Sequence, residues 1–299
     1  MSDFKNFYDL VAPQVYEANY QVSLLKEAIL YQIFADKLHC LVIGHPSVGG
    51  KSFFRKSLEL VCPSFDYAFV KGWTTKIGIG ETALRVGEGL LMLDEVHKLS
   101  TSDMAILYDL LQFQVIKISK FGTNELLSAP VNVIGMGNPK PHGYWNAYGN
   151  VQLMRKQLPV DMALLRRFHI NIFLRDYSDN EFDSVNKFKE TSHNPFVPKD
   201  DAIWFQNEVV ERRQLSPIGK VPENIFNFLK NMKKFENDIV TPVTSELFDG
   251  IIQVATARAR IEKSEQIKKS DWDKTLEFYV KCLRTSGLTN RLIEKKLLK

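Results

Sequence analysis

The sequence has few of the residues that build disulfide-linked, collagen-like or disordered proteins. Among 299 residues there are three cysteines, 12 prolines and 16 glycines. Cys40, Cys62 and Cys282 are odd in number and far apart, which is typical of a reducing compartment and excludes a Cys-x-x-Cys zinc module. Hydrophobic residues make up 44% and charged residues 25%. These values are close to globular averages, so wholesale disorder is excluded.

Long apolar runs and a hydrophobic leader are also missing. No apolar stretch approaches the roughly 18 residues that a membrane-spanning helix needs. Met1 to Lys5 do not combine a basic segment with an apolar one, as a secretion signal would. We therefore expect a cytoplasmic protein without a membrane partner.

No charge of one sign dominates the chain. The formal net charge is +4, which does not by itself indicate a nucleic-acid partner. Residues 251–299 contain twelve Lys and Arg against six Asp and Glu. Such a surplus fits a nucleic-acid contact, but a solvated helical face is the more common cause. Charge alone therefore leaves the partner open.

A glycine-rich loop lies between an apolar run, residues 38–43, and a segment of helical periodicity. The loop reads Gly44, His45, Pro46, Ser47, Val48, Gly49, Gly50, Lys51, Ser52. In a strand–loop–helix of this kind, backbone N–H groups wrap a phosphate at the helix N-terminus, a lysine meets the β- and γ-phosphates, and a hydroxyl binds Mg²⁺. Lys51 and Ser52 are predicted in those two roles. The loop is one residue longer than the usual spacing, unless His45 takes the place of the first glycine.

Polar side chains follow two further predicted strands. Leu90 to Leu93 are apolar and lead into Asp94 and Glu95, and Asn138 follows residues 131–136. Asp94 can hold the Mg²⁺ water shell, and Glu95 can orient and deprotonate the attacking water. Asn138 would lie beside them, because ligands of open α/β folds bind at the carboxyl edge of a parallel sheet; a plain Asn-Pro turn is the alternative. Loop and carboxylates together indicate a P-loop NTPase.

The rest of the chain predicts a hairpin and a helical remainder. Residues 114–129 alternate like two strands, between a helix that Ser100 can cap and the strand at 131–136. Residues 169–174 predict one more strand, after which the pattern is mostly helical. The polar, proline-containing stretch at 192–201 is the best linker candidate.

These residues resemble the AAA+ family and, within it, the ATPase module of the MCM replicative helicases. The resemblance covers roughly residues 7–285 and rests on four segments: Val11 to Tyr16, Leu93 to Pro139, Leu164 to Phe168 and Ala257 to Arg260. It implies an α/β fold with a parallel sheet flanked by helices, a hairpin inserted at about 114–129, and a C-terminal helical lid. The implied domains are an ATPase core, 1–185, and a lid with a basic tail, 186–299.

The resemblance implies a role for each matching residue of the ATP site. ATP and Mg²⁺ are the implied cofactors. Lys51 and Ser52 would form Walker A, Asp94 and Glu95 Walker B, and Asn138 sensor 1.

The resemblance implies two further sites outside the ATP site. Arg167 would be the arginine finger, which enters the ATP site of a neighbouring subunit. Lys120, with Lys117 and Phe121, would face DNA at the hairpin tip and contact its backbone. An exposed lysine on a solvated turn is the alternative for Lys120.

The sequence departs from the MCM pattern at several places. It has no counterpart of the MCM N-terminal barrel and zinc module, and a short basic tail, 288–299, stands in place of the winged helix. Glu246 falls where MCM proteins carry the sensor 2 arginine, so either Arg258 or Arg260 takes that role or the lid does not sense the γ-phosphate. The MCM insertion in helix 2 is shortened to Lys71 to Gly78.

The leading hypothesis is a homo-oligomeric ATPase, a hexameric ring that couples ATP hydrolysis to movement of the hairpin along DNA. It would serve replication of a cell, plasmid or virus, with an archaeal or viral origin, and a loader or other replication proteins would be further partners. A MoxR-like remodeller of proteins is the nearest alternative. A catalytically weak scaffold or regulatory subunit is another, motivated by the lengthened loop and Glu246.

Overall fold

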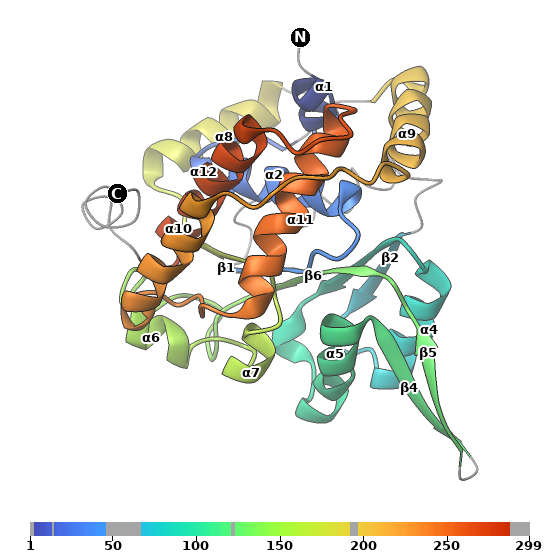
Figure 1. Ribbon diagram of the computed structural model, residues 1–299. Coiled ribbons are helices and arrows are strands. Elements are labelled where there is room, and N and C mark those ends of the chain that lie inside the picture. Colours follow the sequence, from blue (N-terminus) through green and yellow to red (C-terminus); the bar gives the residue numbers. More distant parts are fainter. Residues whose placement is uncertain (1–2, 14, 46–66, 121–122, 192–196, 288–299) are drawn as a thin grey trace.

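A parallel five-stranded sheet forms the centre of the molecule (Figure 1). The computed structural model describes residues 3–13, 15–45, 67–120, 123–191 and 197–287. The strand order is β2-β3-β6-β1-β7, with β1 at Cys40–Gly44, β2 at Tyr67–Lys71, β3 at Leu90–Asp94, β6 at Asn132–Gly137 and β7 at Ile170–Leu174. All neighbouring strands run parallel. The predicted α/β fold is therefore confirmed.

Strand β1 is buried along its whole length, as expected when helices cover both faces of a parallel sheet. Because successive side chains point to opposite faces, Cys40 and Val42 join one hydrophobic cluster and Leu41 and Ile43 join another. Each cluster is completed by helices from a different part of the chain. The sequence run 38–43 thus carries core residues for both layers.

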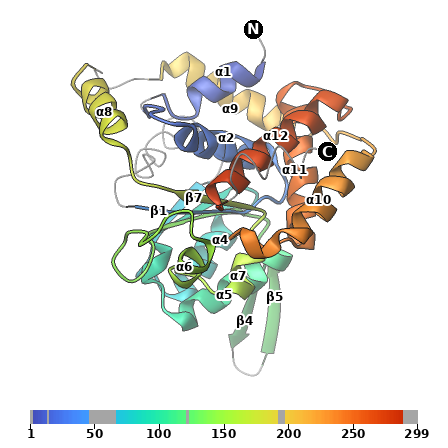
Figure 2. The ribbon, with the colours of Figure 1, turned by 90° about the vertical axis from the view of Figure 1, so that its left-hand side faces the viewer.

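The helices divide between the two faces of the sheet, as Figure 2 shows. The face of Cys40 carries α1 Asp3–Leu10, α2 Tyr20–Phe34, α9 Lys199–Arg213, α10 Glu223–Lys234, α11 Ser245–Ile261 and α12 Lys269–Thr285. The face of Leu41 carries α4 Lys76–Val86, α5 Thr101–Phe113, α6 Val151–Lys156 and α7 Met162–Leu165. Within the described residues, the other helices are α8 Asp179–Thr191 and the short 3₁₀ turns η1 Val96–Lys98 and η2 Glu236–Asp238.

Polar side chains cap the N-termini of α2, α5 and α11. Asn19 accepts hydrogen bonds from the first amides of α2, Ser100 from Asp103 in α5, and Thr244 from Leu247 in α11. Each satisfies a backbone donor that has no partner inside the helix. The predicted start of α5 at Ser100 is confirmed.

The predicted hairpin is also confirmed. β4 Val115–Lys120 and β5 Thr123–Ser128 pair in antiparallel fashion, with Val115 opposite Ser128 and Lys120 opposite Thr123. The hairpin extends away from the body of the protein (Figure 1). It follows α5 and precedes β6, so its base lies at the edge of the sheet where β6 begins.

Two expectations from the sequence stay predictions. The helix predicted after the glycine loop, around Phe54 to Val61, lies outside the described residues. The boundary predicted between core and lid at residue 185 falls within α8 and stays a prediction. Across the described segments, no helix has both the length and the apolar character needed to cross a membrane.

Candidate functional site

Parallel strands bring the predicted ATP-site residues to one edge of the sheet. Gly44 ends β1, Asp94 ends β3, and Asn138 directly follows β6, which lies between them. Neighbouring strands are about 4.8 Å apart, so the ends of β1 and β3 are separated by roughly 10 Å. Of the predicted phosphate loop, the stretch from Pro46 through Ser47, Val48, Gly49, Gly50 and Lys51 to Ser52 lies outside the described residues.

The two described residues of that loop are held by packing. A Cβ on Gly44 would lie 2.5 Å from Cβ of Leu174 in β7, so the adjacent strand requires glycine here. The imidazole of His45 is buried and its Nε2 accepts a hydrogen bond from the backbone of Trp145 at 2.9 Å. Its Nδ1 lies 3.4 Å from the carboxylate of Asp176. The ring of His45 is therefore fixed by contacts with Trp145 and Asp176.

The carboxylates at the end of β3 occupy an unusual turn. Oδ1 of Asp94 accepts a hydrogen bond from the amide of Glu95 at 2.9 Å. Glu95 has φ 56° and ψ 40°, a left-handed conformation that a glutamate rarely adopts and that is found more often at functional sites. Its carboxylate pairs with Nζ of Lys98 at 2.5 Å. The predicted general base is thus held by a cation one turn later in the chain.

His97 joins this turn to the end of β6. Its Nδ1 accepts a hydrogen bond from the backbone amide of Asn138 at 3.2 Å. Burial is the main cause that lowers the pKa of His97 below its usual range, and a neutral imidazole is the form that can accept this bond. Sequence reasoning missed His97; its only signal was its place two residues after Glu95.

The turn after β2 packs against the backbone of Glu95. A Cβ on Gly72 would lie only 2.1 Å from the carbonyl oxygen of Glu95. Trp73 is exposed, and the ammonium groups of Lys71 and Lys98 lie 4.8 and 5.7 Å from the centre of its ring. Sequence reasoning treated this segment only as a shortened insertion, although the glycine beside a tryptophan was a visible signal of close packing.

The donor set fits the Mg²⁺ that the P-loop pattern implies. Mg²⁺ prefers oxygen ligands and is often held by one or two carboxylates together with the phosphates of its nucleotide. Asp94 supplies a carboxylate at the end of β3, and Ser52 would supply a hydroxyl. Asp94 is only partly buried, so its oxygens can reach an ion at this edge.

Arg167 lies at the opposite edge of the sheet. It follows α7 and comes three residues before β7 begins, where the amide of His169 donates to the carbonyl of His39 just ahead of β1. Strands of five residues at about 3.3 Å per residue separate this amino edge from the carboxyl edge by roughly 13 Å. Within one chain, the structure therefore does not bring Arg167 to Asp94.

The predicted DNA-binding residues are placed at the hairpin. Lys117 is exposed on β4, and Lys120 ends that strand. Phe121 lies outside the described residues. The hairpin begins at the amino edge of the sheet, so these lysines are separate from the carboxylates of Asp94 and Glu95.

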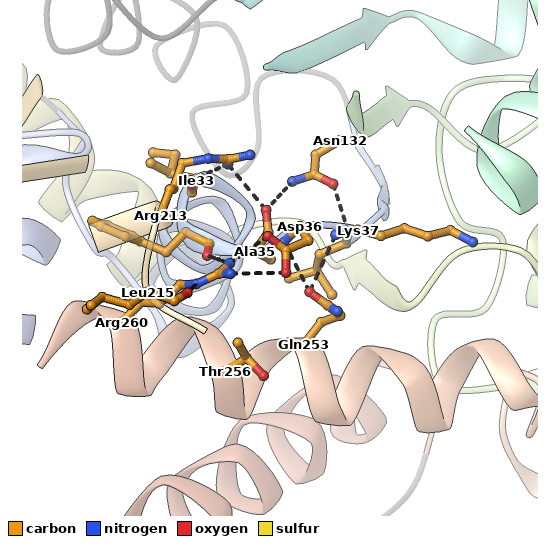
Figure 3. Close-up of polar contacts among 12 residues, drawn as sticks. Ile33, Ala35, Asp36, Lys37, Asn132, Arg213, Leu215, Gln253, Thr256 and Arg260 are labelled. Carbon is orange, nitrogen blue, oxygen red and sulfur yellow. Dashed lines mark hydrogen bonds and ion pairs between the residues drawn. The ribbon is translucent and has the colours of Figure 1, made fainter. Parts of the chain in front are cut away.

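The lid arginines lie far from the carboxyl edge. Arg260 of α11 forms a two-point ion pair with Asp36, at 2.8 and 3.1 Å, just before β1 begins (Figure 3). Arg258 donates to the hydroxyl of Tyr31 near the end of α2. Both guanidinium groups are thus engaged near the amino edge of the sheet. The alternative that Arg258 or Arg260 senses the γ-phosphate of its own subunit is not supported by this placement.

Glu246 lies in the first turn of α11. The N-cap of α11, Thr244, donates to the carbonyl oxygen of Arg166 at 3.4 Å, and Glu246 is two residues further along. The residue just before Arg167 therefore contacts the N-cap of α11, the helix that carries Glu246.

Comparison with known proteins finds similarity to a P-loop family over part of the chain. The MCM P-loop domain matches residues 80–187, a segment that includes Asp94, Asn138 and Arg167 but not the glycine loop. The chain is 24% identical over 270 residues to DNA replication licensing factor MCM7 of Arabidopsis thaliana, covering 80% of this chain and 36% of the relative.

Two further relatives extend the match along the chain. The Minichromosome maintenance protein MCM of Saccharolobus solfataricus is 21% identical over 315 residues, covering 93% of this chain and 44% of the relative. DNA replication licensing factor MCM4 of Drosophila melanogaster is 21% identical, with 94% and 37% covered. The chain thus spans less than half the length of each of these three relatives.

Proposed function

We propose, from the premise that the chain is an MCM-like AAA+ protein, that it is an oligomeric ATPase that moves along DNA. The observation that carries this proposal is the division of the site between two edges of one sheet. Asp94, Glu95 and Asn138 lie at the carboxyl edge, and Arg167 lies at the amino edge. A site built in this way is complete only when a second copy supplies its arginine.

The chemistry at the carboxyl edge follows from its residues. Asp94 and Ser52 would hold Mg²⁺, which when bound neutralises charge on the β- and γ-phosphates. Glu95 orients the attacking water and takes its proton. Asn138 donates from its amide to the water or the γ-phosphate. The carboxylate of Glu95 is held in place by its pair with Lys98.

The amino edge serves the neighbouring subunit. A guanidinium that enters from outside can neutralise γ-phosphate charge in the transition state, and such a finger is worth about 10³ to 10⁵ in kcat. Head-to-tail contacts of this type generate rings when the rotation closes. We therefore propose a ring, with six subunits as the expected number.

DNA is the proposed substrate of movement, and the hairpin is its contact. Exposed Lys117, together with Lys120 and Phe121, would bind the phosphate backbone without reading bases. The proposed division of the chain is into an ATPase core, 1–185, and a lid, 186–299. Replication of a cell, plasmid or virus is the proposed setting, in the cytoplasm.

One experiment tests the function as a whole. ATPase activity of the full chain is measured with Mg²⁺, alone and with single-stranded or double-stranded DNA. We expect hydrolysis that DNA stimulates, and loss of at least about 100-fold in kcat for Glu95→Gln, because that amide cannot accept the proton of the attacking water. No Mg²⁺-dependent hydrolysis by the wild type would overturn the proposal.

The hairpin is tested in the same assay. Lys120→Ala should weaken DNA binding and DNA stimulation while basal hydrolysis is retained. Lys156→Ala, which removes a lysine from the last turn of α6, is the matched control. Unchanged DNA stimulation in Lys120→Ala would favour the MoxR-like alternative, in which the same core acts on proteins.

A further inference from the structure

Arg167 is held in place by the helix that follows the catalytic carboxylates. Its Nε and Nη2 donate to the side-chain oxygen of Gln112 in α5, at 3.2 and 3.0 Å. Its Nη1 donates to the carbonyl oxygen of Ala163 at 2.7 Å. The guanidinium carbon lies 4.8 Å from the centre of the Tyr108 ring, also in α5. The finger candidate is therefore fixed by three hydrogen bonds and an aromatic face.

The residues that hold Arg167 are themselves fixed. The hydroxyl of Tyr108 donates to Oδ2 of Asp161 at 2.5 Å, and Oδ1 of Asp161 caps α7 by accepting from Leu164 at 2.7 Å. We call Tyr108, Gln112 and Asp161 the finger frame. Since α7 leads directly into Arg167, the frame holds both the side chain and the backbone that carries it.

The finger frame is also connected to the C-terminal helices. Nζ of Lys37 donates to the backbone carbonyl of Gln112 at 2.6 Å. The backbone amides of Asp36 and Lys37 donate to the side-chain oxygen of Gln253 in α11, at 3.1 and 3.4 Å (Figure 3). A chain of hydrogen bonds thus runs from the lid helix α11 through Lys37 and Gln112 to Arg167.

The frame leaves part of the guanidinium available. A guanidinium has five N–H donors, and the three hydrogen bonds to Gln112 and Ala163 use three of them. The remaining two can bind a phosphate oxygen. A free arginine side chain carries about 2 kcal/mol of rotamer entropy, and donors that are oriented in advance need no reorganisation when charge develops in the transition state.

We propose that Gln112 and Tyr108 are positioning residues for Arg167, which they orient toward the ATP site of the neighbouring subunit. This inference rests on the proposed function, because it needs a second copy that binds the nucleotide. Helix α5 is about 20 Å long. Its N-terminal end follows Glu95 of the same subunit, and its C-terminal half carries the residues that orient Arg167 toward the neighbouring subunit.

The first test separates kcat from KM. Gln112→Ala should lower kcat for ATP hydrolysis about tenfold and leave KM nearly unchanged, because the nucleotide-binding loop of each subunit is intact. Gln112→Glu keeps an oxygen acceptor for Arg167 and should recover most of the activity. Gln206→Ala, a partly exposed glutamine of α9, is the control and should behave as wild type. A Gln112→Ala enzyme with wild-type kcat would overturn the inference.

Subunit mixing distinguishes positioning of the finger from a general defect. Gln112→Ala protein mixed with Lys51→Ala protein should regain activity, because the intact finger of one completes the intact nucleotide site of the other. Gln112→Ala mixed with Arg167→Ala should regain none. Recovery with Arg167→Ala, or absence of recovery with Lys51→Ala, would overturn the inference. Tyr108→Leu removes the aromatic face and the hydrogen bond to Asp161, and it is tested in the same way if Gln112→Ala does not fold.

A reference mixture distinguishes failure of this inference from failure of the proposed function. Arg167→Ala and Lys51→Ala proteins should recover activity when mixed, whatever Gln112 does. If they do not, the shared site itself fails. If they do and the Gln112 variant does not follow Arg167, only the positioning role fails.

Discussion

The backbone amide of Asn138 donates a hydrogen bond to Nδ1 of His97, and this bond connects the ends of β3 and β6. His97 lies in the 3₁₀ turn directly after Glu95. A Cβ on Gly137 would lie 3.4 Å from this nitrogen and 2.8 Å from a methyl group of Val96, so the glycine permits the close approach of the two strand ends. The distance between the predicted base and the predicted sensor is set by this contact.

Removal of the His97 acceptor should impair hydrolysis more than folding. We expect His97→Ala to lower kcat about tenfold, because the partly buried amide of Asn138 loses its partner and the strand ends separate. His97→Asn places an oxygen close to the position of Nδ1 and should retain most activity. Steady-state ATPase kinetics measure both, with His142→Ala, an exposed histidine after β6, as control. Equal kcat in His97→Ala and His97→Asn would contradict the role of the hydrogen bond.

The turn after β2 should be intolerant of a single methyl group. In Gly72→Ala the new Cβ would meet the carbonyl oxygen of Glu95 at 2.1 Å, and because the neighbour is backbone, the turn that holds Glu95 must move. We expect kcat to fall at least tenfold and the protein to lose about 2 kcal/mol of stability. ATPase assays and urea unfolding measure the two effects.

Gly78→Ala is the matched control for this substitution. Gly78 lies in the first turn of α4, where the nearest obstacle is a methyl group of Thr74 at 2.9 Å, and alanine favours the helix. Its kcat should remain close to wild type. A Gly72→Ala enzyme as active as Gly78→Ala would show that the position of Glu95 does not depend on this turn.

Local patterns predicted the sheet and the ends of its strands. Apolar runs such as Leu90 to Leu93 predict strands because both faces of a parallel strand are buried. The edge at which Asp94 and Asn138 meet follows from parallel topology alone. The partners of those residues could not be predicted in this way. His97 meets Asn138 across 41 positions and Gln112 meets Arg167 across 55, and no periodicity in the sequence encodes either contact.

The reason for a residue was also harder to predict than its position. Gly44 was expected as part of a phosphate loop, yet its missing Cβ is explained by Leu174 of the neighbouring strand. Arg258 and Arg260 were considered for the γ-phosphate because of their place in the lid. Their contacts with Tyr31 and Asp36 depend on how α11 crosses the sheet, which is a property of tertiary packing.

Two buried histidines should make stability depend on pH. Nδ1 of His169 accepts from the amide of His39, and Nδ1 of His39 accepts from Val133. Burial lowers the pKa of His169 to about 3 and that of His39 well below its usual range. As both folded-state pKa values lie below the unfolded value of about 6.5, the unfolded chain takes up protons first. Stability is therefore full above pH 6.5 and is lost as pH falls.

Urea unfolding between pH 7 and 5 measures this dependence. Each histidine should contribute a slope of up to about 1.4 kcal/mol per pH unit. His169→Asn removes one titrating group and should reduce the slope by that amount, whereas His142→Asn should not. Glu181, with a pKa of about 2, adds slope only below roughly pH 4.5, outside this range. An unchanged slope in His169→Asn would contradict the assignment.

The ion pair between Arg260 and Asp36 should be strongly asymmetric. The Arg260 side chain is 5% exposed, whereas that of Asp36 is 58% exposed, so water can replace the carboxylate but not the guanidinium. Arg260 also donates to the carbonyl oxygens of Leu215 and Phe34. Without the guanidinium, these oxygens would lose the hydrogen bonds that it supplies. We expect Arg260→Ala to cost about 3 kcal/mol and Asp36→Ala about 1 kcal/mol.

Urea unfolding of both single variants and the double variant measures this asymmetry. In the double variant the cost of Asp36→Ala should largely vanish, because the charge that it compensates is gone. Lys274→Ala, which removes an exposed pair with Glu277, should change little and serves as control. If Asp36→Ala lowered the free energy of unfolding as much as Arg260→Ala does, the ion pair would be the main stabilising contact. The hydrogen bonds from Arg260 to the two carbonyls would then contribute little. The expected inequality instead makes the carbonyl contacts the main link between α11 and the segment that leads into β1.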